Sequence, residues 1–229
     1  LEQSLEVSLK ALDFFADDDK TGNKAMCYNS IGNIHERLGD YDKAEEAYMQ
    51  GMGILKTLGE KRMLYNIMGS LGLIKIRKKE FQKAIDYLKP TLEGFAKLKH
   101  KNGEQLTLVQ LGNAFVGLGQ YAKGMTHYTK ALKLLKQNAS KTVEADALEG
   151  IGKVYLHLEG FEDALRHFDR AMEIVQEIKF YSAICGLYID YANVYMATKD
   201  IGKALEKVDA GLEISQKHNL KLETQLLLA

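Results

Sequence analysis

The sequence has little proline, little cysteine and no tryptophan. Its 229 residues include one proline, Pro90, and two cysteines, Cys27 and Cys185. Because proline inside a helix costs roughly 3 kcal/mol, this scarcity favours long uninterrupted helices. The two cysteines lie far apart and in no metal-binding or redox spacing, so we expect two reduced core thiols in a reducing compartment.

The sequence also lacks an excess of either charge and a long apolar run. The 31 basic and 31 acidic side chains sum to zero, and a neutral chain has no long-range attraction to nucleic acid or to an anionic membrane. No apolar run approaches the ~20 residues that span a bilayer, and no signal-peptide pattern occurs. We therefore expect a cytoplasmic protein without membrane insertion and without direct nucleic-acid binding.

No grouping of residues supports catalysis. The six histidines stand in no zinc-binding spacing. The glycines form no phosphate-binding loop, and nothing resembles the turn that carries a nucleophilic serine. The run Asp17-Asp18-Asp19-Lys20 resembles the start of a calcium loop but lacks the remaining ligands, so a solvated turn is expected. We expect no enzyme activity, no metal and no cofactor.

What the sequence has is a repeat of 40 residues, found by sliding it against itself. A small residue that follows an apolar one is the first repeated feature. A large apolar residue lies nine positions further on, and small and bulky residues alternate after it. The first two features align without insertion or deletion at Gly32 and Tyr41, Gly72 and Phe81, Gly112 and Tyr121, Gly152 and Phe161, and Ala192 and Ile201.

Within each unit the apolar residues recur every three or four positions, which indicates helices. In the first unit Tyr28, Ile31 and His35 share one helical face. Gly39 then provides a helix end and Asp40 a cap for the next helix. The sequence therefore predicts a helix, a tight turn and a second helix, and the turn pattern recurs at Leu118-Gly119-Gln120 and Glu159-Gly160.

The mid-helix small residues need an explanation, because glycine there costs up to about 1 kcal/mol. A small residue at the crossing point of two helices lets their axes approach. We therefore expect the aromatic residue of the neighbouring helix to pack against the backbone at these positions.

At these residues the chain resembles the tetratricopeptide repeat family, and the match covers about residues 22–217. The departures are the absence of tryptophan and of a proline near the end of each unit. His35 and Lys75 also stand where the family usually has tyrosine. Units of 40 rather than 34 residues are similar to those of spindle-orientation scaffolds. They also resemble the sensory arrays fused to bacterial histidine kinases, nucleotide cyclases and transcription regulators.

The resemblance implies an all-α fold, a right-handed α-α superhelix of antiparallel helix pairs. Leu1 and the apolar run at the end suggest a fragment of a longer protein. The segments expected of one continuous array are the second helix of a preceding partial repeat at 1–16, full repeats at 22–60, 61–100, 101–140, 141–180 and 181–220, and the first helix of a further partial repeat at 221–229.

In the family the first helix of each repeat lines the concave side. Asparagine amides there can pair with a peptide backbone, and exposed apolar residues mark a contact site. Two alternatives stay open: the asparagines are solvated or bond the adjacent helix, and the apolar residues pack against the next unit. The predicted peptide-binding residues are Asn29, Asn33, Arg37, Asn66, Leu73, Ile76, Arg77, Leu106, Val109, Asn113, Val116, Glu149, Lys153 and Asn193.

The function that follows from the resemblance is a scaffold that binds a protein or peptide ligand in its concave groove. The first alternative is a sensory or regulatory module of a longer signalling protein, with a kinase, cyclase or transcription-regulator output domain elsewhere. The second is end-to-end self-association through apolar faces left uncovered at both ends, such as Leu226-Leu227-Leu228.

Overall fold

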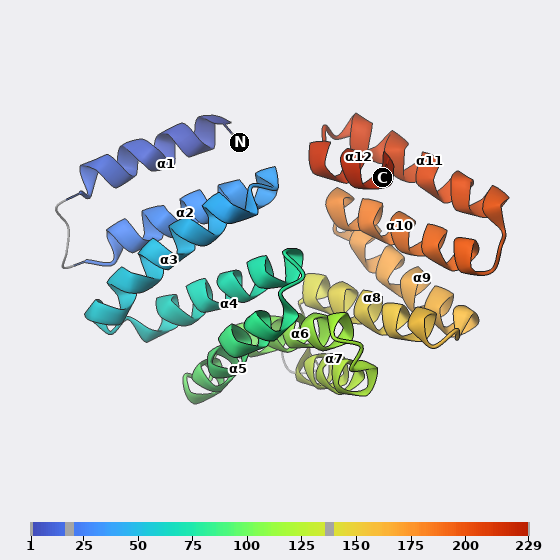
Figure 1. Ribbon diagram of the computed structural model, residues 1–229, viewed down its shortest axis with the longest axis horizontal. Helices are drawn as coiled ribbons and strands as arrows, with labels where there is room; N and C mark the ends of the chain where they lie inside the picture. The colour runs from blue at the N-terminus through green and yellow to red at the C-terminus, as the bar shows by residue number, and fades with distance from the viewer. Residues whose placement is uncertain (1, 17–20, 136–139, 229) are drawn as a thin grey trace. The chain divides into compact units, whose positions relative to one another are not determined.

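The computed structural model describes residues 2–16, 21–135 and 140–228, so the predicted solvated turn at Asp17–Lys20 lies outside the described residues. Within these ranges the chain forms α-helices joined by turns, and no strand (Figure 1). The helices are α1 Glu2–Phe14, α2 Asn23–Leu38, α3 Tyr41–Leu58, α4 Lys61–Arg77, α5 Phe81–Lys97, α6 Lys101–Gly117, α7 Tyr121–Leu135, α8 Lys141–His157, α9 Phe161–Glu177, α10 Tyr181–Ala197, α11 Ile201–Lys217 and α12 Lys221–Leu228.

The chain divides into two compact units, Leu1–Leu118 and Gly119–Ala229, so the division falls inside the predicted repeat at 101–140. In the first unit each helix from α1 to α6 packs against the next, and α4 also contacts α6. In the second unit α7 to α12 pack in the same serial way, and α10 contacts both α8 and α12. Each unit is therefore all-α and built from helix pairs stacked in chain order.

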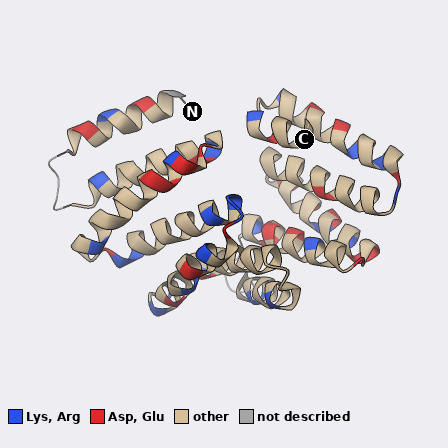
Figure 2. Ribbon diagram, viewed as in Figure 1, with Lys and Arg blue, Asp and Glu red and all other residues tan. Residues whose placement is uncertain are grey.

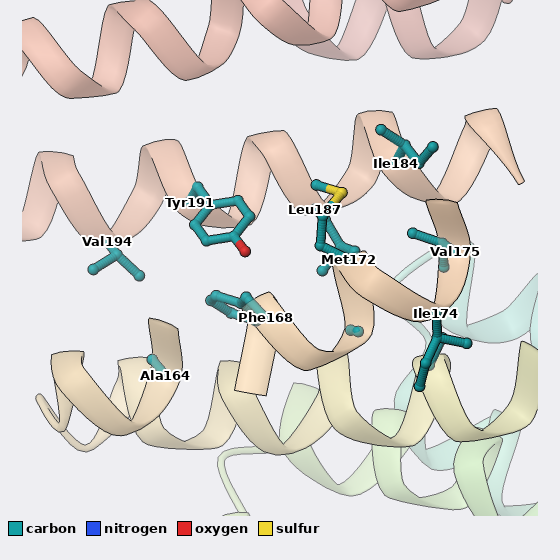
Figure 3. Packing of buried hydrophobic residues seen from close by; sticks show 11 residues of the cluster. Ala164, Phe168, Met172, Ile174, Val175, Ile184, Leu187, Tyr191 and Val194 are labelled. Atoms are coloured by element: carbon teal, nitrogen blue, oxygen red, sulfur yellow. The ribbon is translucent and has the colours of Figure 1, made fainter. Parts of the chain in front are cut away.

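A buried apolar cluster holds the second unit together (Figure 3). Phe168 of α9 lies edge-on to Tyr191 of α10, with ring centroids 5.8 Å apart and planes inclined at 70°. Further along the same two helices, Val175 and Leu187 are each only 1% and 0% exposed. The first unit has an equivalent cluster around Tyr48, so every hairpin buries its apolar face against its neighbours.

The small residues of the repeat lie where a neighbouring side chain meets the backbone. A Cβ atom added to Gly32 would lie 2.5 Å from Cε1 of Tyr48. Added to Gly152 it would lie 2.4 Å from Cε1 of Phe168, and added to Gly72 it would lie 2.5 Å from Cδ2 of Leu88. The predicted close approach is confirmed, with leucine in place of an aromatic residue in the second repeat.

The one proline does not interrupt its helix. Pro90 lies inside α5, and its side chain is exposed. Proline removes the hydrogen bond to the carbonyl of the residue four positions earlier, here Asp86. Asp86 is itself exposed, so we infer that water replaces the missing donor and that the helix tolerates the substitution.

The turns between helices repeat every 20 residues, because one residue in each described turn has a left-handed backbone. Gly39 has this conformation with φ 80°, which confirms it as a helix end. In most turns the residue is not glycine, although a side chain there costs about 1–2 kcal/mol. The left-handed residues are Gly39, Gly59, Lys79, Lys99, Gly119, Glu159, Lys179, Lys199 and Asn219.

Two details of the predicted turns are wrong. Asp40 makes no capping bond to the backbone of α3; its carboxylate instead lies 3.4 Å from Nδ1 of His35. With ψ at 64° the Asp40 backbone is not in the extended conformation that directs a capping side chain to the helix. In the pair Glu159-Gly160 it is Glu159 that has positive φ, and Gly160 precedes the next helix.

We predict that Gly32→Ala lowers the free energy of unfolding by about 1–2 kcal/mol, because the new methyl group overpacks against the buried ring of Tyr48. Gly53→Ala is the matched control, since nothing lies within 4 Å of its added Cβ in α3. Alanine there should raise stability by up to about 1 kcal/mol. Urea unfolding of both variants measures the difference, and equal effects would contradict the packing argument.

We also predict that Lys179→Gly raises the free energy of unfolding by about 0.5–1 kcal/mol, because glycine adopts φ 55° without steric cost. Gln176→Gly, three residues earlier in the interior of α9, should lower it by about 1 kcal/mol. Thermal and urea unfolding compare the two, and destabilisation by both would show that the left-handed turn is not strained.

Candidate functional site

The predicted ligand residues lie on the first helices of the hairpins. In the first unit these are α2, α4 and α6, and α4 contacts α6. In the second unit they are α8, α10 and α12, and α10 contacts both of its neighbours in this set. Each unit therefore carries a layer of adjacent first helices, and we call the face of this layer that bears the predicted residues the first-helix face.

The structure divides the predicted residues by exposure. Most are open or half open to solvent, as a ligand-binding residue has to be. The exposed ones are Asn33, Arg37, Asn66, Arg77, Leu106 and Asn193, the half-buried ones are Asn29, Leu73, Ile76, Asn113, Val116, Glu149 and Lys153, and the buried one is Val109.

Val109 and Ile76 differ from the predicted role of apolar anchors. Val109 is only 2% exposed, so its side chain has almost no surface for a ligand. Ile76 packs against the buried cluster of α5 and α6. Leu106, by contrast, is 44% exposed. The alternative of packing inside the protein therefore holds for Val109 and for part of Ile76, and Leu106 keeps the surface of an anchor.

In the first unit the hydroxyl of Tyr48 organises the polar residues of α2. It donates to Oδ1 of Asn33 at 2.7 Å and lies 3.2 Å from Oε2 of Glu36. Burial raises the pKa of Glu36, and the nearby charge of Arg77 on α4 opposes the rise. Burial also raises the pKa of the Tyr48 hydroxyl, so it stays a neutral donor. Asn33 is thus bonded to the second helix of its own hairpin and still exposes part of its side chain.

In the second unit a cluster of two acids and one lysine spans α8 and α10. Nζ of Lys153 donates to Oε1 of Glu149 and lies 3.2 Å from Oδ2 of Asp190. The side chain of Asp190 is 7% exposed, that of Glu149 22% and that of Lys153 40%. The structure therefore brings together two predicted residues, Glu149 and Lys153, with a third that the sequence analysis missed.

Asp190 is the most strongly perturbed acid of this cluster. Burial raises its pKa to about 7; Lys153 opposes the rise and Glu149 adds to it. Burial likewise raises the pKa of Tyr128 on α7, which senses the charges of Lys153 and Glu149. A signal for Asp190 was present in the sequence, because the 40-residue spacing places only uncharged residues at its equivalent positions: Ser30, Ser70, Gln110 and Gly150.

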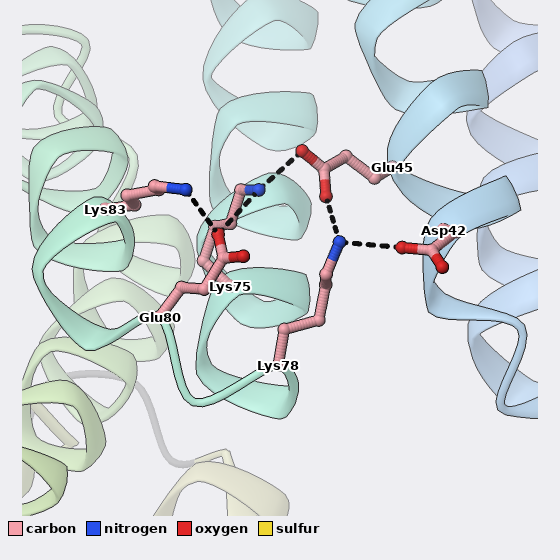
Figure 4. A network of polar contacts seen from close by, with 6 residues as sticks. All are labelled: Asp42, Glu45, Lys75, Lys78, Glu80 and Lys83. Atoms are coloured by element: carbon pink, nitrogen blue, oxygen red, sulfur yellow. Dashed lines mark hydrogen bonds and ion pairs between the residues drawn. The ribbon is translucent and has the colours of Figure 1, made fainter.

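A second charged network explains Lys75, which stands where the family usually has tyrosine (Figure 4). Its side chain is 8% exposed and its ammonium lies 2.5 Å from Glu45 and 2.9 Å from Glu80. Burial works against the charge of Lys75, but pairing with the two acids raises its pKa. Lys78 joins Glu45 to Asp42, so the network ties α3 to the end of α4.

An open pocket of about 420 Å³ adjoins this network. It is lined by one face of α3 and by Lys78, and contains none of the predicted ligand residues. Its walls include the exposed Met49 and two acids, Asp42 and Glu45, that are already paired with Lys78. Ion pairing within the protein therefore accounts for this surface.

Charges of both signs are interspersed along the helices of each unit (Figure 2). Among the described residues no three histidine, cysteine or acidic side chains are grouped so that they could hold a metal ion. No helix in the same part of the chain has the length and apolar character to cross a membrane.

Comparison with known proteins identifies the repeat. Family models described as tetratricopeptide repeat match residues 26–54 and 103–177. No curated protein matches the sequence.

Among solved structures, a Rap protein complexed with Competence and Sporulation Factor matches 94% of this chain and 61% of its own, with a TM-score of 0.82 and 16% identity. NprR in complex with its cognate peptide NprX matches 95% and 64%, with a TM-score of 0.79 and 16% identity. A signal-transduction ATPase with a tetratricopeptide repeat sensor, from Pyrococcus horikoshii, matches 85% and 30%, with a TM-score of 0.63 and 22% identity.

These likenesses show the fold, a helical solenoid of the tetratricopeptide type, and confirm the predicted all-α class. The chain spans less than two thirds of the length of each of the three structures.

We predict that Asp190→Asn changes the pH dependence of stability. The pKa of Asp190 is raised to about 7 in the folded protein against about 3.9 in an unfolded chain. The folded state therefore holds the proton more tightly, and the wild-type chain loses stability relative to the variant as pH rises from about 4 to 7, by up to about 1.4 kcal/mol per pH unit. Urea unfolding across this range measures it; a pH-independent difference would contradict the assignment.

Proposed function

We propose that this chain, whose helical hairpins are tetratricopeptide repeats, is a protein-interaction scaffold that binds a peptide or a helix along its first-helix face. The observation that carries the proposal is the set of residues left exposed there. The repeat buries its small and bulky positions in every hairpin, but leaves side chains of varied chemistry on the outer turns of the first helices.

Exposed apolar side chains on this face support a contact function. Met26 of α2 and Leu106 of α6 occupy equivalent positions of the repeat and are 55% and 44% exposed. Met196 of α10 is 55% exposed. Exposed apolar surface on a folded protein often marks a binding site, and flexible methionine adapts to partners of different shape.

Polar residues next to these anchors fit a ligand with free backbone groups. Asn33 and Asn193 stand at equivalent positions of their repeats, and both are exposed. An amide side chain carries donors and an acceptor, so it can pair with the backbone of an extended peptide of any sequence. Arg37 and Arg77 would act on the choice of ligand and on its register more than on affinity.

Two of the solved structures with this fold are described as complexes with a factor or a cognate peptide. They support a peptide as the class of ligand for this chain. The proposal includes the predicted repeat boundaries from 22–60 to 181–220, and it assigns no catalytic role and no cofactor to the described residues.

A second candidate is a regulatory module within a longer signalling protein. The ATPase with a tetratricopeptide repeat sensor favours it, because this chain matches only 30% of that protein. A kinase, ATPase, cyclase or DNA-binding segment in the same reading frame would support this role. A reading frame that encodes repeats alone would leave the scaffold as the better proposal.

Self-association is the third candidate, through apolar residues of the end helices. Val7 and Phe14 of α1 are 66% and 83% exposed, and Leu228 of α12 is 71% exposed. Light scattering over a range of concentrations tests it: a mass that rises with concentration supports end-to-end contact, and a constant monomer mass rules it out.

We predict that the double variant Leu106→Glu, Asn193→Arg retains helical content but loses at least about 90% of peptide retention, because it removes an apolar anchor and a backbone-pairing amide. The measurement is capture of a random nonapeptide library on the immobilised chain, quantified by mass spectrometry. The matched control, Gln82→Glu with Lys130→Arg, changes exposed residues of the second helices α5 and α7. Full retention by the double variant would show that the first-helix face is not the binding surface.

A further inference from the structure

The Glu149–Lys153–Asp190 cluster is not part of what builds the repeat. The positions equivalent to Asp190 hold Ser30, Ser70, Gln110 and Gly150, and those equivalent to Glu149 hold Asn29, Gly69, Val109 and Ile189. All of these residues are uncharged, and their hairpins form without an acid there. The two carboxylates therefore have no role in the hairpin architecture that the other repeats share.

Placing Asp190 in the interior is unfavourable for folding. Its side chain is 7% exposed, and a buried acid is stabilised only by good hydrogen bonds and a close opposite charge. Lys153 lies 3.2 Å from its Oδ2 atom, but that oxygen has no hydrogen bond of acceptable geometry. The donated bond of Lys153 goes to Glu149 instead. One buried carboxylate oxygen thus remains without a donor.

The cluster also carries one negative charge more than it balances, since two carboxylates share a single ammonium group. The remaining basic groups of the two helices are Lys141 and His157 near the ends of α8, and α10 carries none. Tyr128, which also faces the cluster, is a neutral phenol. A second cationic group placed here would balance the charge and supply donors.

Access to the cluster is from the first-helix face. Glu149 and Lys153 are 22% and 40% exposed, and the exposed Asn193 lies one helical turn beyond Asp190 on α10. A long flexible side chain that entered beside Lys153 would reach Glu149 first and Asp190 behind it. The planar guanidinium group of arginine, with five donors, is suited to two neighbouring carboxylates.

We infer that Glu149 and Asp190 form a subsite for a cationic side chain, arginine or lysine, of the peptide bound to the second unit. The inference rests on the proposed function, since it names the chemistry of one ligand position. Glu149 makes the outer contact, Asp190 the inner one, and Lys153 holds both carboxylates in place when no ligand is bound.

The test compares two nonapeptide libraries that are random except at the central residue, which is arginine in one and citrulline in the other. Citrulline has the shape of arginine without its charge. We expect the unaltered chain to retain the arginine library about tenfold more than the citrulline library, a difference that corresponds to about 1.4 kcal/mol. A third library with central lysine shows whether the planar group or the charge alone is recognised.

Glu149→Gln and Asp190→Asn each leave the cluster neutral, and each should bring the ratio of retention close to one. The matched control is Glu173→Gln on α9, whose exposed carboxylate is paired with Arg170, and it should keep the tenfold ratio. Circular dichroism verifies the fold of every variant, and Glu149→Gln, at a half-buried position, provides the test if Asp190→Asn does not fold.

Equal retention of the arginine and citrulline libraries by the unaltered chain would overturn the inference and leave the proposed function standing. A preference for arginine that survives both variants would also overturn it, because the cation would then bind elsewhere. Retention of neither library would overturn the proposed function and, with it, the inference.

Discussion

The structure depends on one contact: a bulky side chain of the second helix in a hairpin touches the backbone of the first helix. Tyr48 over Gly32 and Phe168 over Gly152 leave no room for a Cβ atom. Glycine weakens each first helix by up to about 1 kcal/mol, and the buried ring offsets this by removing apolar surface from water. Because the contact recurs every 40 residues, the hairpins stack in the same way within each unit.

This division of labour separates the residues that build the fold from those available for recognition. Positions that recur at 40 residues face the interior, so the first helices are free to vary on their outer side. Arg77, Leu106 and Asn193 are exposed there and follow no repeat. Residues that break the repeat inside the protein are fewer. Lys75 is one of them, and its pairs with Glu45 and Glu80 account for it as a structural link between α3 and α4.

The all-α class and the glycine contacts could be predicted because they follow from local periodicity and from the size of single residues. The failures share a different cause. Capping by Asp40 depends on a backbone angle that the turn sets, and here ψ is 64°. Burial of Val109 depends on which helices surround it, and the spacing of residues along one helix does not contain that information. Asp190 was missed because its partners lie on another hairpin, although its charge at an uncharged position of the repeat was visible in the sequence.

The central claim is that recurring residues build the hairpins and that the non-recurring residues of the first helices bind the ligand. Amide hydrogen exchange, measured with and without the peptide best retained from a random library, tests it most directly. The account predicts slower exchange on binding in the first helices, chiefly α2, α6, α8 and α10, with little change in α3, α5, α9 and α11. Protection concentrated in the second helices would contradict it.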